Sequence, residues 1–169
     1  MSSGCGPSGG QSDDEPAANL DYLAQDGNDL SVTTGLVADG VRDWLAGQGA
    51  AELSAVSWVV EDASTAKGYP LVTVAETGSQ EHDVLVGVYE VSVEVALETN
   101  PTDTDEAAAK AMKDALYGLV GDRRRMISGL DDRADLQCWE ARTVGMSTTA
   151  EDGRRRDAFT LTVVAAAQV

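Results

Sequence analysis

The residues of this chain that could serve as nucleophile, base or metal ligand are few and scattered. His82 is the only histidine, and it lies between Glu81 and Asp83. A nucleophilic serine or cysteine therefore has one possible histidine base, and a metal site built from several histidines is excluded. We interpret His82 as an exposed polar residue in a loop at the entrance of a strand.

The two cysteines stand in unlike sequence contexts. Cys5 lies in a Gly/Ser-rich segment, whereas Cys138 lies beside Trp139 in a predicted strand. This pattern is not a disulfide framework, and it fits a reducing compartment. We interpret Cys138 as a half-buried strand residue rather than a nucleophile, because no histidine lies near it in the sequence.

A short acidic group, Asp103, Asp105 and Glu106, suggests a calcium site at first sight. The twelve-residue loop with its glycine is missing, however, and acidic residues also favour the N-terminus of a helix. The glycines of residues 4–10 precede no strand–helix unit, and no Gly-Lys-Ser/Thr motif follows them, so a phosphate-binding loop is excluded. We therefore predict no metal, no cofactor and no catalytic residues, and we expect that the chain is not an enzyme.

Charge is the strongest feature of the composition. The 169 residues include 29 acidic and 12 basic ones, which gives a net charge of −17. Residues 1–109 contain only Arg42 and Lys67 as basic residues, so the whole negative excess lies there. A protein this acidic does not grip DNA or an anionic membrane through its whole surface. Three interpretations stay open, namely simple solubility, adaptation to high salt, and a negative channel or DNA-mimicking surface.

Two arginine runs contrast with the acidic remainder: Arg123-Arg124-Arg125 and Arg154-Arg155-Arg156. One interpretation is that they are loop charges paired with local acids such as Asp122, Asp131, Asp132, Asp152 and Asp157. Another is that they bind carboxylates of an adjacent subunit, because a guanidinium fork holds a carboxylate through two hydrogen bonds. A DNA-binding role would have to overcome the surrounding negative field. For the subunit contact, which closes head to tail into a ring, the predicted interface residues are these six arginines with Glu90 and Glu94.

The longest strand pattern runs through residues 83–98. Every odd position from Leu85 to Leu97 is apolar or glycine, which is the period of a β-strand. Val84, Val86 and Val88 occupy even positions, so we expect the first half of this strand to be covered on both faces. At roughly 3.3 Å per residue the strand is longer than a compact domain, and part of it must bend or project.

Other elements are predicted on both sides of this strand. Amphipathic spacing predicts a helix from Ser31 as N-cap to Gly47 or Gly49, and a second helix capped by Thr102 or Asp103 and ended by Gly121. Four further strands are predicted: Ser54–Glu61, Leu71–Glu76, 136–147 and 156–166. Thr77-Gly78-Ser79 is the predicted connection from the second of these to the long strand. The last two are predicted to be joined by a hairpin at Glu151-Asp152-Gly153.

These elements predict an α+β fold in the order helix, three strands, helix, two strands. We expect a mostly antiparallel sheet packed by two helices. Residues 1–29 are predicted to be an extended N-terminal arm, because their Gly/Ser-rich and acidic composition cannot bury enough apolar area. Residues 30–169 are predicted to be a single domain. No secretory signal or transmembrane span is evident, so we expect a soluble protein.

This element order resembles that of the small tail terminator or tail completion proteins of tailed phages. The resemblance rests on the YPLVTV strand, the long VYEVSVEVAL strand and the Asp-led DEAAAKAMKDAL helix, and it covers roughly residues 31–166. It implies a non-enzymatic virion subunit that forms a ring, expected to be a hexamer, which caps the tail tube and joins it to the neck or head. DNA would pass through the lumen without sequence-specific binding. The implied partners are further copies of the chain, the tail tube protein and neck or connector proteins.

Two alternatives to this function stay open. The first is another phage neck, connector or tube-associated component, in which the N-terminal arm would bind a tube or sheath partner. The second is an acidic inhibitor that mimics DNA and blocks a nucleic-acid enzyme. The DNA mimic predicts competition with DNA for a basic protein, and it leaves the arginine runs without a role.

Overall fold

A computed structural model describes residues 35–61 and 68–168 of the chain. The predicted arm and the predicted Ser31 cap therefore lie outside the described residues. Residues Leu36–Val169 form one compact unit. Its elements in chain order are α2 (Leu36–Gly47), η1 (Ala51–Leu53), β2 (Ser57–Val60), β3 (Leu71–Glu81), β4 (Tyr89–Thr99), α3 (Glu106–Val120), α4 (Arg123–Asp131), β5 (Leu136–Glu151) and β6 (Arg154–Ala167).

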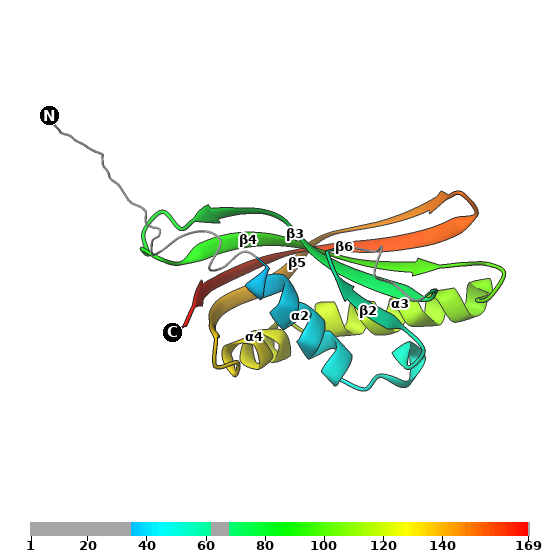
Figure 1. Cartoon of the computed structure of the whole chain (residues 1–169), viewed down its shortest axis with the longest axis horizontal. Coiled ribbons are helices and arrows are strands. Elements are labelled where there is room, and N and C mark those ends of the chain that lie inside the picture. The colour runs from blue at the N-terminus through cyan, green and yellow to red at the C-terminus, as the bar shows by residue number, and fades with distance from the viewer. Residues whose placement is uncertain (1–34, 62–67, 169) are drawn as a thin grey trace, which may run out of the picture. The chain divides into compact units, whose positions relative to one another are not determined.

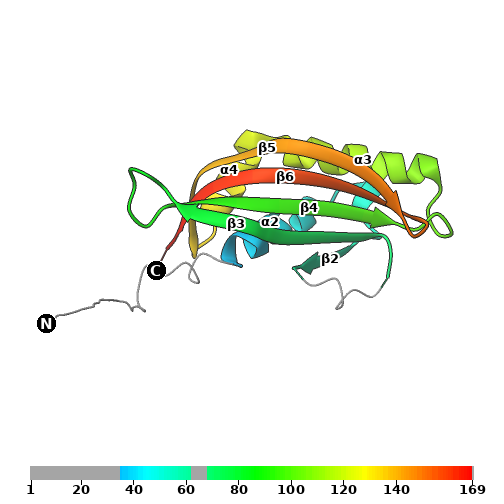
Figure 2. The same ribbon diagram turned by 90° about the horizontal axis from the view of Figure 1, so that it is seen from above.

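The strands form one five-stranded sheet in the order β2-β3-β4-β6-β5. β2 pairs with β3 in parallel, and the other three pairs are antiparallel. The three α-helices lie against one face of the sheet (Figure 1), and the view from above shows the strands in front of them (Figure 2). The fold is α+β with a mixed, mostly antiparallel sheet, as predicted.

Alternation along the central strands separates the core from the face that carries no helix. In β4, Val91, Val93, Val95 and Leu97 are buried, and in β6 the core residues include Phe159, Leu161 and Val163. The helices supply Val37, Val41 and Leu45 from α2, Leu116 and Val120 from α3, and Met126 and Leu130 from α4. From β2, Trp58 and Val60 pack against this core.

The connection between β3 and β4 differs from the prediction. β3 continues through Thr77-Gly78-Ser79, with an irregularity in its register between Glu76 and Gly78, and ends only at Glu81. β4 begins at Tyr89, which pairs with Glu81. Residues 82–88 therefore form the connection of a hairpin, and the predicted two-sided burial of Val84 and Val86 was wrong.

The N-terminus of α3 lies two to three residues after the predicted cap. Asp105, not Thr102 or Asp103, is the N-cap, and its carboxylate accepts a hydrogen bond of 2.8 Å from the backbone N–H of Ala108. Asn100 explains the shift, because its side-chain oxygen accepts bonds from the N–H and hydroxyl of Thr102 and holds that residue in a turn before the helix. Gly121 follows the helix, as predicted.

Removal of this cap gives a first testable outcome. Asp105→Ala is expected to lower the free energy of unfolding by about 1 kcal/mol, because a backbone donor of the first turn loses its acceptor. Asp103→Ala is the matched control, since Asp103 is exposed and its side chain makes no hydrogen bond among the described residues. Urea unfolding of the two variants measures the difference, and equal losses would contradict the assignment of the cap.

A third α-helix, α4, occupies residues that the sequence indicated as a loop. Asp122 is its N-cap and accepts a bond of 3.3 Å from the N–H of Arg125. The first turn consists of three arginines, which oppose the helix dipole. Burial of Met126 and Leu130, spaced four residues apart, offsets this cost and holds α4 against the sheet.

The hairpin of β5 and β6 is confirmed. Asp152 and Gly153 both have positive φ, 53° and 73°, which is the geometry of a two-residue hairpin turn. Both strands are longer than predicted, and β5 is an edge strand of 16 residues. Its register with β6 shifts twice, so that Trp139 and Val144 are extra residues without a partner in β6. Such bulges interrupt the regular edge of a sheet.

Candidate subunit-interaction surfaces

The first arginine run is held mainly by side chains of its own chain. Arg123, at the start of α4, donates to both carboxylate oxygens of Glu140 in β5, at 2.6 and 2.5 Å. This pair lowers the pKa of Glu140, because Arg123 hydrogen bonds to its ionised form. Arg125 donates to Gln48 and lies 3.5 Å from Asp122. Local pairing therefore accounts for two of the three arginines.

The second arginine run lies in β6 and is also paired within the chain. Arg156 donates to Glu94 at 2.7 Å and lies 3.5 Å from Glu98, both in β4. Arg155 donates to the fully buried Asp157 at 2.9 Å. Arg154 hydrogen bonds to the hydroxyl of Tyr69 and lies over the ring of that residue. The predicted interface residues Glu94 and Arg156 thus meet each other across two strands of one chain.

The remaining predicted residue of β4, Glu90, accepts a bond of 3.4 Å from Gln80 in β3. Arg124 is different from the other arginines of the runs. It is exposed at the start of α4 and makes no hydrogen bond or ion pair with any described residue. Of the eight predicted interface residues, Arg124 is the one that has no hydrogen-bond or ion-pair partner among the described residues.

Arg142 in β5 is a second arginine with this property, and no sequence pattern distinguishes it from the other arginines. It is exposed, and among the described residues it has no hydrogen bond or ion pair. The other described lysines and arginines each have a partner. Arg124 and Arg142 could be found only by identifying those partners one by one.

The connection between β3 and β4 is an exposed apolar tip. Val84 and Val86 are 78% and 87% exposed, and Leu85 between them is 44% exposed. The tip is shaped by its own polar groups: His82 Nδ1 accepts from the N–H of Val84 at 3.2 Å, and the carboxylate of Glu81 accepts from the N–H of Gly87 at 3.0 Å. The apolar side chains therefore point away from a backbone that is fixed by hydrogen bonds.

A second apolar surface lies where β5 meets α3. Tyr117 and Met146 are about half exposed, and they line a cleft of about 430 Å³ together with Gly121, Arg123, Arg142, Thr143 and Gly145. Tyr117 also stacks on the buried Phe159, with ring centroids 5.9 Å apart. The two bulge residues, Trp139 and Val144, are exposed along the same strand. We call this cleft the β5 cleft.

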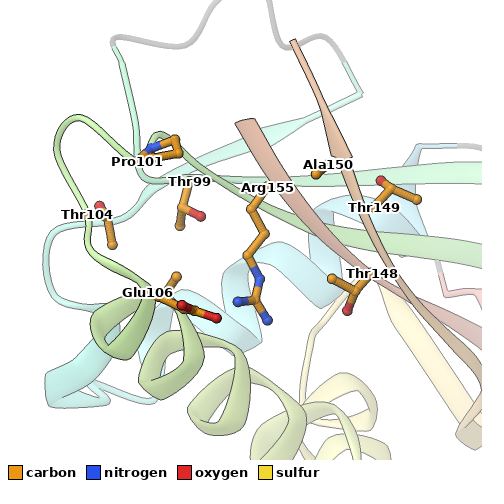
Figure 3. A pocket seen from close by; sticks show the side chains of 9 residues that line it. Thr99, Pro101, Thr104, Glu106, Thr148, Thr149, Ala150 and Arg155 are labelled. Carbon is orange, nitrogen blue, oxygen red and sulfur yellow. The ribbon is translucent and has the colours of Figure 1, made fainter. Parts of the chain in front are cut away.

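Another cleft, of about 540 Å³, separates the start of α3 from the β5–β6 hairpin. Its lining residues are Thr99, Pro101, Thr104, Glu106, Ala109, Thr148, Thr149, Ala150 and Arg155. Figure 3 shows Arg155 reaching from β6 toward the first turns of α3. Its guanidinium is already bound to Asp157, so this hairpin cleft presents no unpaired cation.

The residues considered for chemistry lie apart from one another. His82 is in the β3–β4 connection, where its ring supports the backbone. Cys138 is buried in β5, and burial raises the pKa of its thiol to about 11, so it stays protonated at neutral pH. Within residues 35–61 and 68–168, no group of three or more His, Cys, Asp or Glu side chains could hold a metal ion.

Comparisons with known proteins give no further assignment. No protein-family model matches the sequence, and no curated protein matches it. In the part of the chain that the structure describes, no helix has the length and apolar character to cross a membrane.

Proposed function

We propose that this chain is a structural subunit of a tailed-phage virion, a tail terminator or tail completion protein. In this proposal, copies assemble head to tail into a ring at the end of the tail tube, with tube and neck or connector proteins on either side. The ring is proposed to be a hexamer. It has no catalytic role, and it lets DNA pass toward the tail.

The observation that carries the proposal is the position of the exposed apolar side chains. Among the described residues, the large exposed hydrophobics fall in two places: Val84, Leu85 and Val86 at the tip of β3–β4, and Tyr117, Trp139, Val144 and Met146 at β5 and α3. Exposed apolar patches of this kind are typical of protein–protein contacts. Two different patches on one chain are what a head-to-tail contact requires, and such contacts close into rings.

The charge of the chain supports passage of DNA. A ring of subunits that each carry −17 has a strongly negative field, which repels phosphates and prevents the duplex from adhering. Most described cations are bound to acids of the same chain, so they do not present a basic track to DNA. The acidic inhibitor and the neck component remain as the competing functions to be separated by experiment.

The mass of the purified protein in solution tests the proposal. Light scattering is expected to show an oligomer of about six times the 17.6 kDa chain mass, and negative-stain images are expected to show rings with a central hole. Because copies with a net charge of −17 repel one another, assembly is expected to strengthen as salt rises from low to physiological concentration.

Two results would contradict the proposed ring. One is a strict monomer at every salt and protein concentration, both alone and with cognate tail tubes. The other is capture by a basic nucleic-acid enzyme in competition with DNA, which would favour the inhibitor. Binding to tail or neck proteins without ring formation would favour the broader neck role.

A further inference from the structure

We infer that the apolar tip of β3–β4 in one copy docks into the β5 cleft of the next copy. This inference rests on the proposed function, because it names the two surfaces that would join neighbouring subunits. The occupant of the cleft is a second copy of this chain. The two surfaces match in their apolar and charged groups.

The tip offers apolar side chains beside unpaired negative charge. Val84 and Val86 extend into solvent, and Asp83 next to them has no hydrogen bond or ion pair among the described residues. Glu81 receives a backbone N–H but no cation. The tip therefore fits an apolar surface whose rim is positive.

The β5 cleft has those properties. Tyr117 and Met146 form its apolar part, and no acidic residue is among its lining residues. Of the two arginines that line it, Arg123 is bound to Glu140, so Arg142 supplies the unpaired positive charge. Arg142 has no hydrogen bond or ion pair among the described residues, although its charge helps to lower the pKa of Glu140. Arg124 is exposed at the start of α4 beside Arg123. Aromatic residues, methionine and arginine are the types enriched at the centres of protein interfaces.

The hairpin cleft fits the tip less well, although it is larger. Arg155 is bound to Asp157 there, and Glu106 lines the same cleft without a cation among the described residues. An acidic tip would meet a carboxylate with no free arginine to balance it. Charge therefore selects the β5 cleft over the hairpin cleft.

The tip and the β5 cleft lie far enough apart for one copy to use both. Met146 pairs with Phe159, which pairs with Val95 in β4. Tyr89, where β4 leaves the tip, lies six residues from Val95, or roughly 20 Å along the strand. A contact between two such surfaces is heterologous, so each copy has one tip to give and one cleft to fill.

A mixing experiment tests this directionality. The double variant Val84→Asp/Val86→Asp disables the tip, and the double variant Arg142→Asp/Met146→Asp disables the cleft. All four positions are exposed, so both variants should still fold. Circular dichroism would verify this. Each variant alone is expected to be monomeric where the wild type assembles. Their equal mixture is expected to give a discrete heterodimer, because one intact tip meets one intact cleft. Lys110→Glu, exposed on α3 outside the cleft, is the control and should assemble like the wild type.

Disulfide trapping identifies the surface that the tip meets. In a Cys5→Ser background, Val86→Cys with Met146→Cys is expected to give a ladder of cross-linked chains under oxidation. A bond within one chain is not expected, because Met146 lies level with Val95, roughly 20 Å along β4 from the end that leaves the tip, and bridged Cα atoms lie within about 7 Å. Val86→Cys with Ala150→Cys, which places the second thiol in the hairpin cleft, is the matched comparison.

The outcomes separate the inference from the proposed function. Rings that form normally from the tip variant, or a ladder only with Ala150→Cys, would overturn the docking inference and leave the ring intact. A cleft variant that still assembles would indicate contacts between tips and would also overturn it. A wild-type chain that is monomeric under every condition, with no ladder, would contradict both.

Discussion

Replacement of Asp157 by alanine is expected to destabilise the domain by about 3 kcal/mol. The carboxylate is fully buried in β6, where it accepts bonds from Thr148 at 2.6 Å and Arg155 at 2.9 Å, with Lys113 at 3.9 Å. Its removal leaves two partly buried cations without a counter-charge. Since Arg155 and Lys113 keep 24% and 22% of their side-chain exposure, the loss should lie at the lower end of the range for broken buried pairs.

Two further variants assign the cause of this loss. Asp157→Asn keeps the volume and an acceptor for Thr148 but removes the charge, so a smaller loss of about 2 kcal/mol is expected. Asp114→Ala removes an exposed acid whose hydrogen-bond partner is Lys110, and it should leave stability nearly unchanged. Urea unfolding followed by circular dichroism measures all three. A loss for Asp157→Ala no larger than that for Asp114→Ala would show that the buried charges are not coupled.

The two hairpins show which parts of the fold could be predicted from sequence. The β5–β6 turn depends on Asp152-Gly153, a local pair that adopts positive φ, and its position was predicted. The β3–β4 turn depends on the pairing of Glu81 with Tyr89, which sequence alternation does not reveal. Alternating valines continue through residues 84–88, so they indicated a longer strand. The pairing of β4 with β3, and not the local alternation, determines that β4 begins at Tyr89.

The interaction surfaces were less predictable than the fold, because exposure is a tertiary property. Tyr117 and Met146 have the residue types of a core and became surface residues only through the packing of α3 against β5. Arg142 stands alone in the sequence and gained interest only when the other arginines proved to be paired. The arginine runs attracted attention by composition, yet the structure gives most of their side chains partners within the chain.

The crossing of α2 and α4 depends on the absence of a side chain at Gly129. A Cβ atom there would lie 2.1 Å from Cδ1 and 2.3 Å from Nε1 of Trp44, which packs against the core. Gly129→Ala should therefore force the indole out of its place. The gain in helix propensity, about 1 kcal/mol, opposes an overpacking cost of about 1–3 kcal/mol. Because an indole at this contact is large and held by its neighbours, we expect a net loss of about 2 kcal/mol.

Gly118 in α3 provides a control of opposite sign. It also lies inside a helix, but no atom lies within 4 Å of a Cβ built there, so Gly118→Ala should stabilise the domain by about 0.5–1 kcal/mol. In a Trp44→Ala background, Gly129→Ala should lose its penalty and become stabilising as well, because the two sites then no longer clash. Thermal and urea unfolding of the single and double variants would measure this reversal. If Gly129→Ala were as stabilising as Gly118→Ala in the wild-type background, the contact between Trp44 and α4 would not hold the two helices together.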